Sequence, residues 1–158
     1  MVQYWLMKSE PSAYSWEQFE SEGSTHWDGV RNYQARNLMR DEMRVGDMVL
    51  FYHSNCKPPH VAGIARVCRE AYPDHTALDS TSKYFDSKAT LENPRWMMVD
   101  IEHVKAMENT VSLHDMKANP ELEGMPLLQR GQRLSVQPVL IHHFEAICHM
   151  GGLSEIPS

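Results

Sequence analysis

The chain has 158 residues, of which 42% are hydrophobic and 23% are charged. This length and composition fit one globular domain with a hydrophobic core, and they exclude a disordered chain and two domains of ordinary size. The formal net charge of −6 argues against general binding of nucleic acid, and three cysteines without Cys-x-x-Cys spacing indicate a reducing compartment.

The first predicted elements are a strand and a short helix. The apolar run Tyr4–Met7 predicts a buried strand, and the polar segment Lys8–Pro11 ends it because proline cannot donate to a strand ladder. Ser15 and Gln18 have the spacing of a capping box, so we expect a helix that runs to the break at Gly23. The inward-facing residues of this helix are predicted to be Trp16 and Phe19.

The segment His26–Met39 is the most unusual part of the sequence, because it gathers aromatic, arginine and amide side chains around one glycine. Asp28 and Gly29 predict a turn, and Asn32 is a candidate N-cap for the helix that follows. The inward face of that helix is predicted to carry Ala35, Leu38, Met39 and Met43. The free N–H groups of a helix N-terminus suit an anion or a ring that is rich in carbonyl groups.

Later segments have the apolar pattern of strands. The predicted strands are Met48–Ser54, Val61–Val67, Trp96–Val104 and Leu134–Val136. The continuous apolar character of Met48–Ser54 predicts a strand that is covered on both faces. Residues 70–95 lack periodicity and predict a long loop that carries Tyr84 and Phe85.

Two more helical segments are predicted in the last third of the chain. Ser112–Asp115 can cap a short turn, and Pro138 at a first helical position with Gly151 past the end predicts a longer helix. The inward-facing residues of the longer helix are predicted to be Leu140, Phe144 and Ile147. Strands outnumber helices without alternating regularly with them, which argues against a doubly wound parallel sheet. We therefore predict an α+β fold, a small mixed β-barrel with flanking helices.

The sequence lacks the spacings of the common metal and nucleotide sites. His142 and His143 are adjacent, so they point to different helix faces, and His143–Glu145 lacks the Pro-Cys-x-x-Cys partner of a zinc deaminase. No His-Glu-x-x-His motif, Gly-x-x-x-x-Gly-Lys loop, nucleophile elbow or dinucleotide fingerprint occurs. We therefore predict no metal, no cofactor and no catalytic residue.

Charge is distributed unevenly along the chain. Residues 29–69 hold seven basic and three acidic side chains, whereas residues 70–158 hold seven basic and thirteen acidic ones. This asymmetry is compatible with a basic face for a polyanion and equally with an ordinary solvated surface.

No apolar run approaches the length of a membrane span and no secretory signal is visible. We expect no membrane partner and no secretion, with a cytoplasmic location in a bacterium or a nuclear one in a eukaryote.

The aromatic residues divide into two groups by their settings. The tryptophans in apolar runs, which are expected in the core, are Trp5, Trp16 and Trp96. Trp27 stands in a polar, turn-like setting that suits a core role and a site role equally. With Tyr33, Tyr84 and Phe85 as neighbours, Trp27 would form an aromatic cage that stacks an unpaired base. The side chains expected to read the base edge are Ser9, Asn32, Asn37, His53 and Ser54.

Five motifs cover nearly the whole chain in order: Tyr4–Pro11, Trp27–Asn37, Gly46–Asp47 leading into Phe51–Ser54, Gly63–Ala65 and Leu134–Val139. Together they resemble an EVE domain, the family of thymocyte nuclear protein. The resemblance implies a PUA-like fold, related to the YTH domains that read methylated adenine in RNA, and a reader of modified bases in DNA or RNA. It also predicts a single domain over residues 1–152 and a C-terminal tail over residues 153–158.

The resemblance to YTH domains further suggests roles for individual residues. Lys8 and Ser9 are similar to the Lys-Ser pair that ends the first YTH strand, and Trp27 is similar to the first cage tryptophan. The predicted base-binding pocket comprises Ser9, Glu10, Trp27, Asn32, Tyr33, Asn37, Tyr52, His53, Ser54, Tyr84 and Phe85. The predicted phosphate contacts are Lys8, Arg31, Arg36 and Lys57.

Three functions follow from these patterns. The favoured one is a non-catalytic, monomeric reader that binds a modified cytosine or adenine of DNA, or of RNA, in an aromatic-lined pocket. The second is an enzyme that acts on a modified nucleotide or a small molecule and uses His53 or Glu10 as an acid or base. The third is a protein-interaction domain whose pocket holds a peptide or metabolite, so that binding ignores salt.

Overall fold

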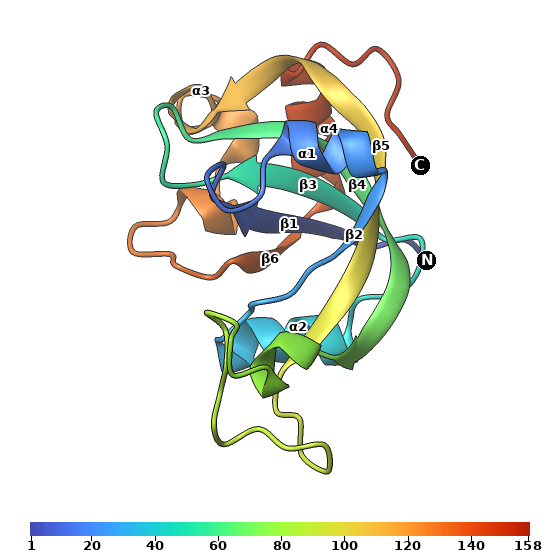
Figure 1. Cartoon of the computed structure of the whole chain (residues 1–158). Helices are drawn as coiled ribbons and strands as arrows, with labels where there is room; N and C mark the ends of the chain where they lie inside the picture. The colour runs from blue at the N-terminus through green and yellow to red at the C-terminus, as the bar shows by residue number, and fades with distance from the viewer.

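The computed structural model describes residues 1–158 and contains one six-stranded sheet with helices on both faces (Figure 1). The strands are β1 (Tyr4–Ser9), β2 (Ser24–His26), β3 (Met48–His53), β4 (His60–Pro73), β5 (Met97–Ser112) and β6 (Val136–Val139). The α-helices are α1 (Trp16–Glu22), α2 (Tyr33–Asp41), α3 (Leu113–Lys117) and α4 (Ile141–Met150). Three short 3₁₀ helices are η1 (His75–Leu78), η2 (Pro120–Leu122) and η3 (Pro126–Leu128).

The sheet has the strand order β2-β5-β4-β3-β1-β6, and β2 and β6 do not pair with each other. Both edges are short, and β6 carries Pro138, which cannot donate to a further strand. The sheet is therefore open, and the closed barrel that we expected is not shown. A mixed α/β domain dominated by strands is confirmed, as is the absence of a doubly wound parallel sheet, because only the β1–β3 pair is parallel.

The sheet is covered on both faces because the side chains of a strand alternate between them. On one face Leu6 and Tyr52 belong to a hydrophobic cluster with Phe144 of α4. On the other face Trp5 and Phe51 belong to a cluster with residues of α1 and α2. The prediction that β3 is covered on both faces is confirmed, since all six of its residues are buried.

The predicted helix starts at Ser15, Asn32 and Ser112 are confirmed by their capping hydrogen bonds. Each side chain accepts from the backbone N–H three residues later. The prediction for the last helix is partly wrong: Pro138 lies in β6, and α4 begins only at Ile141, so Leu140 is 58% exposed. Phe144 and Ile147 are buried as expected.

Three features of the structure were absent from the sequence prediction. The edge strand β2 is too short to show periodicity, and β4 and β5 run several residues beyond their apolar cores and bend strongly (Figure 1). The long loop expected over residues 70–95 is shorter than predicted, because residues 70–73 belong to β4 and η1 follows, and the loop between η1 and β5 hangs below α2 in Figure 1. Leu153, in the predicted tail, is only 3% exposed and belongs to the α4-side cluster. No helix combines the length and the apolar character that crossing a bilayer requires.

Candidate nucleic-acid interface

A cavity of about 940 Å³ lies at the end of β1, and we call it the Trp27 cavity. Its lining comes from β1 and the turn after it, from the segment around Trp27, from the long loop and from the chain before β6. The lining residues are Lys8, Ser9, Glu10, Ala13, Tyr14, Glu22, Thr25, His26, Trp27, Asp28, Gly29, Val30, Arg31, Ser54, Lys83, Tyr84, Gln132, Arg133 and Ser135. A volume of this order is in the range of small-molecule and cofactor sites.

Strand pairing brings the first set of polar residues together. Because β1 and β3 are parallel, their C-terminal ends lie at the same edge of the sheet, and the Ser54 N–H donates to the Ser9 carbonyl at 3.1 Å. On the other side of β1, the antiparallel β6 brings Ser135 beside Lys8, whose N–H donates to the Ser135 carbonyl at 2.8 Å. These pairings place Lys8, Ser9, Ser54 and Ser135 at one end of the cavity.

Trp27 is both a core residue and a cavity residue. It follows β2 directly, and its N–H donates to the Val99 carbonyl at 2.7 Å, which continues the pairing of β2 with β5. The indole packs edge-on against Phe51, with ring centroids 5.5 Å apart, and the residue is 7% exposed. The two roles that the sequence left open for Trp27 are therefore combined, and the indole is a firmly packed part of the cavity wall.

Gly29 allows Tyr84 to form part of the cavity wall. Gly29 has φ +80°, as the predicted turn requires, and a Cβ atom built on it would lie 2.6 Å from Cζ of the Tyr84 ring. Any other residue at this position would strain the backbone and push Tyr84 away. The close approach of ring to backbone is therefore specified by this one glycine.

A buried ion pair holds this wall together. The carboxylate of Asp74 is fully buried, and it accepts from Arg31 Nη1 at 2.9 Å and from the Gly29 N–H at 2.9 Å. Arg31 also donates through Nε and Nη2 to the Tyr84 carbonyl at 3.0 and 2.8 Å. Burial raises the pKa of Asp74, but hydrogen bonds from Thr76, Gly29 and Arg31 outweigh it, so the pKa lies below its usual value.

Three cations of the cavity have no ion-pair or hydrogen-bond partner within the protein: Lys8, Lys83 and Arg133. Lys83 and Arg133 are exposed, and Lys83 Nζ lies 5.1 Å from the centre of the Tyr84 ring. Lys8 is half-buried, and this burial lowers its pKa. Because these groups come from three separate segments, they can contact an anion that extends across the mouth of the cavity.

The structure brings seven of the predicted site residues to the cavity: Lys8, Ser9, Glu10, Trp27, Arg31, Ser54 and Tyr84. Within this group Arg31 does not have the arrangement expected of a phosphate contact. Its guanidinium is occupied by Asp74, Thr76 and the Tyr84 carbonyl, and its side chain is 22% exposed. Its position therefore supports the aromatic wall.

Four predicted residues at α2 lie outside the cavity. Asn32 uses its side chain as the N-cap and accepts from the Ala35 N–H at 3.0 Å. Tyr33 stacks on Trp96, with centroids 4.7 Å apart and an interplanar angle of 21°, and Arg36 lies 4.6 Å from the Tyr33 ring centre. The side-chain oxygen of Asn37 accepts from Arg36. We call Tyr33, Trp96, Arg36 and Arg95 the Tyr33 stack.

The other displaced predictions fall on or near β3 and in the long loop. Tyr52 is buried on the α4 face because it alternates with Phe51, so it cannot line a cavity on the opposite face. His53 is 3% exposed: its Nε2 accepts from the Trp16 N–H at 3.1 Å, and its Nδ1 lies 3.0 Å from the Ser9 carbonyl. Phe85 and Lys57 are exposed and do not line the cavity.

Several lining residues were not predicted. Asp28 was assigned only to a turn, and Tyr14, Lys83, Gln132 and Arg133 were assigned no site role. Lys83 adjoins Tyr84, and Gln132–Arg133 immediately precede the motif Leu134–Val139, so proximity to recognised motifs was the available signal. Only the pairing of β6 with β1 shows that the chain before β6 reaches the cavity.

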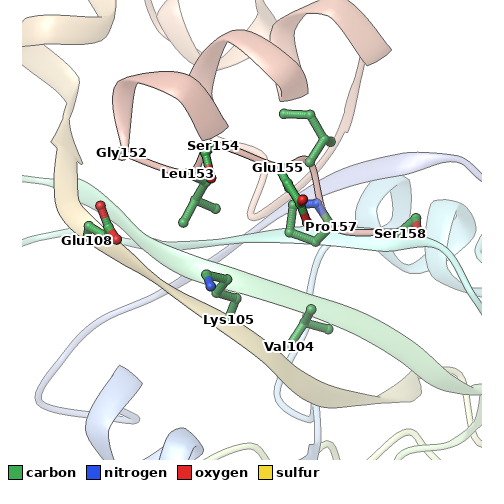
Figure 2. A pocket seen from close by; sticks show the side chains of 10 residues that line it. Val104, Lys105, Glu108, Gly152, Leu153, Ser154, Glu155, Pro157 and Ser158 are labelled. Carbon is green, nitrogen blue, oxygen red and sulfur yellow. The ribbon is translucent and has the colours of Figure 1, made fainter.

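A second hollow of about 350 Å³ lies between β5 and the C-terminal segment (Figure 2). Val104, Lys105 and Glu108 line it from β5, and residues 152–158 line it from the other side. It has no aromatic side chain, so it offers no stacking surface for a base. Elsewhere, no three His, Cys, Asp or Glu side chains are grouped closely enough to hold a metal ion.

Comparison with known proteins places this geometry in a family. Residues 3–150 match the EVE domain. Human thymocyte nuclear protein 1 is 39% identical over 163 aligned residues, which cover 91% of this chain and 72% of that protein. A crystal structure of a Pseudomonas putida protein is 49% identical and covers 94% of this chain and 99% of that chain, with a TM-score of 0.90. Human THYN1 in complex with 5-methylcytosine-containing DNA is 36% identical, covers 99% of this chain and 100% of that chain, and has a TM-score of 0.89.

Proposed function

The chain belongs to the EVE domain family, and from that premise we propose that it is a non-catalytic reader that binds a modified nucleobase of DNA or RNA in the Trp27 cavity. The observation that carries the proposal is one cavity lined both by aromatic rings and by cations without protein partners. The human THYN1 structure, which contains 5-methylcytosine DNA, supports a modified base as the ligand. We further propose that the open sheet is a PUA-like variant related to YTH domains, and that the protein acts as a monomer, nuclear in a eukaryote or cytoplasmic in a bacterium.

The energetics require contacts beyond the base. Taking a base out of a stack costs a few kcal/mol, and stacking on an aromatic side chain returns about 1–3 kcal/mol. Since these contributions nearly cancel, the affinity must come from phosphate contacts and from hydrogen bonds inside the cavity. Lys8, Lys83 and Arg133 are the proposed phosphate contacts, in place of Arg31 and Arg36, because their charges are free to pair with a ligand.

The side chains favoured for catalysis are poorly placed for it. His53 has both ring nitrogens engaged with backbone groups, and burial lowers its pKa, so it is held as a neutral structural residue. Glu10 accepts from Asn55 Nδ2 at 3.0 Å and is exposed. Neither group is paired with a nucleophile, which supports binding without turnover.

The test is a binding series with single-stranded and double-stranded oligonucleotides that carry one central 5-methylcytosine, N6-methyladenine or unmodified base. We expect tighter binding of a modified oligonucleotide and an affinity that falls as salt rises. Equal affinity for modified and unmodified strands would remove the reader function. Binding that ignores salt would favour the peptide or metabolite ligand instead.

A second measurement separates the reader from an enzyme. The protein, supplied with divalent metals, is incubated with the same oligonucleotides, which are then digested and analysed by mass spectrometry. We expect full recovery of every modified nucleoside. Loss of one that disappears in His53→Ala or Glu10→Gln would establish catalysis.

A further inference from the structure

Asp28 is the one carboxylate of the Trp27 cavity without a hydrogen-bond donor. The two other cavity carboxylates are engaged: Glu10 accepts from Asn55, and Glu22 accepts from the Tyr14 hydroxyl at 2.6 Å. The ion-pair contact of Asp28 is with His26, whose Nε2 lies 3.7 Å from Oδ2, which is beyond hydrogen-bond length. Asp28 therefore has a free acceptor, and its side chain is 31% exposed.

A comparison of the pKa values of Asp28 and Asp74 also indicates that Asp28 lacks a hydrogen-bond donor. Both carboxylates are next to Arg31 and Gly29 in the fold, and both are partly or fully buried. Hydrogen bonds lower the pKa of Asp74 despite its burial, whereas burial and then the charge of Asp74 raise the pKa of Asp28. A ligand that brings a donor to a desolvated, unpaired acceptor forms a hydrogen bond that contributes strongly to the free energy of binding.

The chemistry of a methylated base decides which donor is needed. Thymine and 5-methylcytosine both carry a methyl group at C5, so contact with the methyl group cannot distinguish them. They differ at position 4, where cytosine has an amino donor and thymine has a carbonyl acceptor, and at N3, where cytosine accepts and thymine donates. A reader of 5-methylcytosine in DNA must therefore examine this edge of the base, and at position 4 a carboxylate is suited to that task because it accepts only.

We propose that Asp28 makes the Trp27 cavity specific for a 4-amino pyrimidine, with 5-methylcytosine as the ligand, by accepting a hydrogen bond from its exocyclic amino group. This inference rests on the proposed function and adds a specificity-determining residue to it. Asp28 directly follows Trp27, so the indole that stacks the base and the carboxylate that reads its edge come from one stretch of backbone. With thymine, O4 would face the carboxylate and repel it.

The experiment measures affinities of single-stranded 11-mers that carry one central variable base: 5-methylcytosine, thymine or 5-methyl-2-pyrimidinone, which lacks the amino group. A matched base contact is worth about a 5- to 150-fold difference in affinity. We expect wild-type protein to prefer 5-methylcytosine over both other bases by a factor in this range. Asp28→Asn should bring the preference over thymine close to unity, because an amide can either accept from N4 or donate to O4.

Asp41→Asn is the matched control, because it makes the same substitution at an exposed carboxylate outside the cavity that already accepts hydrogen bonds from Arg40. It should keep the wild-type preference. A folded Asp28→Asn protein with the wild-type preference would overturn the inference while leaving the reader function standing. Equal wild-type affinity for 5-methylcytosine and 5-methyl-2-pyrimidinone would overturn it without any variant, and tighter binding of an N6-methyladenine 11-mer would overturn the choice of a pyrimidine. If wild type does not distinguish 5-methylcytosine from unmodified cytosine, the proposed function itself fails.

Discussion

The Trp27 cavity and the Tyr33 stack lie on either side of Arg31, whose guanidinium carbon is 5.7 Å from the Tyr84 ring centre and 5.4 Å from that of Trp96. Both regions are built from aromatic rings and cations. In the stack, these groups satisfy one another: Arg36 donates to the Arg95 carbonyl at 2.8 Å, and Arg95 pairs with Asp86 at 3.4 Å. In the cavity, Lys8, Lys83 and Arg133 have no such partners.

The difference shows that residue type alone does not mark a binding surface. The polar groups of the stack are engaged within the protein, and the Trp96 indole N–H donates to Asp86 at 2.7 Å. The stack therefore has a structural role, which is to join α2 to the chain before β5. The cavity keeps acceptors and cations free, at a cost in internal pairing that a ligand can offset. Substitutions in the two regions should therefore affect different quantities.

The largest effect is expected for Trp27→Ala. Because the indole is buried against Phe51, the free energy of unfolding should fall by about 3–5 kcal/mol, and binding of a modified base should be lost with the stacking surface. Urea unfolding and fluorescence polarisation measure the two effects.

Trp27→Phe is the control for the two roles of Trp27. It keeps an aromatic ring in the core, so it should recover more of the stability than of the affinity. An alanine variant with wild-type stability would contradict the packing described here. One with wild-type affinity would place the base elsewhere.

Asp74→Asn should have the next largest effect, because it leaves Arg31 without its buried partner. Breaking a buried ion pair costs about 3–5 kcal/mol, and the lower end applies since Arg31 keeps its bonds to Tyr84. Glu102→Gln is the control: it removes a partner of the partly exposed pair Arg66–Glu102, whose Nε and Oε1 atoms are 3.6 Å apart, and should cost no more than about 1 kcal/mol. Equal losses in the two variants would show that the buried pair has no special weight.

The same pair predicts a dependence on pH. The pKa of Asp74 in the folded state is below its unfolded value of about 3.9. Its contribution to stability is therefore fully present above pH 4 and is lost as the pH falls through the lower, folded-state pKa. Urea unfolding at a series of pH values should show wild type and Asp74→Asn converging in acid. A constant difference down to pH 2 would assign the stability to another group.

Lys83→Ala and Arg133→Ala should leave stability nearly unchanged, since both residues are exposed, but should weaken binding to oligonucleotides. Each lost phosphate contact should make the plot of log affinity against log salt shallower by about one unit. Arg36→Ala is the matched control from the Tyr33 stack and should keep the wild-type slope. The opposite pattern, with only Arg36→Ala changing the slope, would move the phosphate contacts to the stack.

The smallest effect on binding is expected for Tyr33→Ala. The loss of its stack on Trp96 should lower the free energy of unfolding by about 0.5–1.5 kcal/mol beyond the loss of buried area, without a change in affinity for the modified base. Titrations of wild type and variant with the same oligonucleotide test this. A marked loss of affinity would make the stack part of the binding surface and end the contrast between the two regions.

The sequence by itself determined features that depend on near neighbours in the chain. The caps at Ser15, Asn32 and Ser112, the turn at Gly29 and the doubly covered strand β3 each rest on a few consecutive residues, and each is present as predicted. The motifs also identified the family, since they extend along most of the chain. Five of the eleven predicted pocket residues, including Trp27 and Tyr84, line one cavity, because they belong to these motifs or to the loop beside them.

Only the tertiary structure decided which polar groups are used up and which stay free. Tyr52 was wrongly predicted to line the pocket because the register of β3 turns its side chain to the α4 face of the sheet. Arg31 was wrongly predicted to contact phosphate because its guanidinium pairs with Asp74, forty-three residues away. Arg133 was missed because β6 returns beside β1 only after more than a hundred residues. Pairing over such separations depends on the packing of the whole sheet, and no local pattern records it.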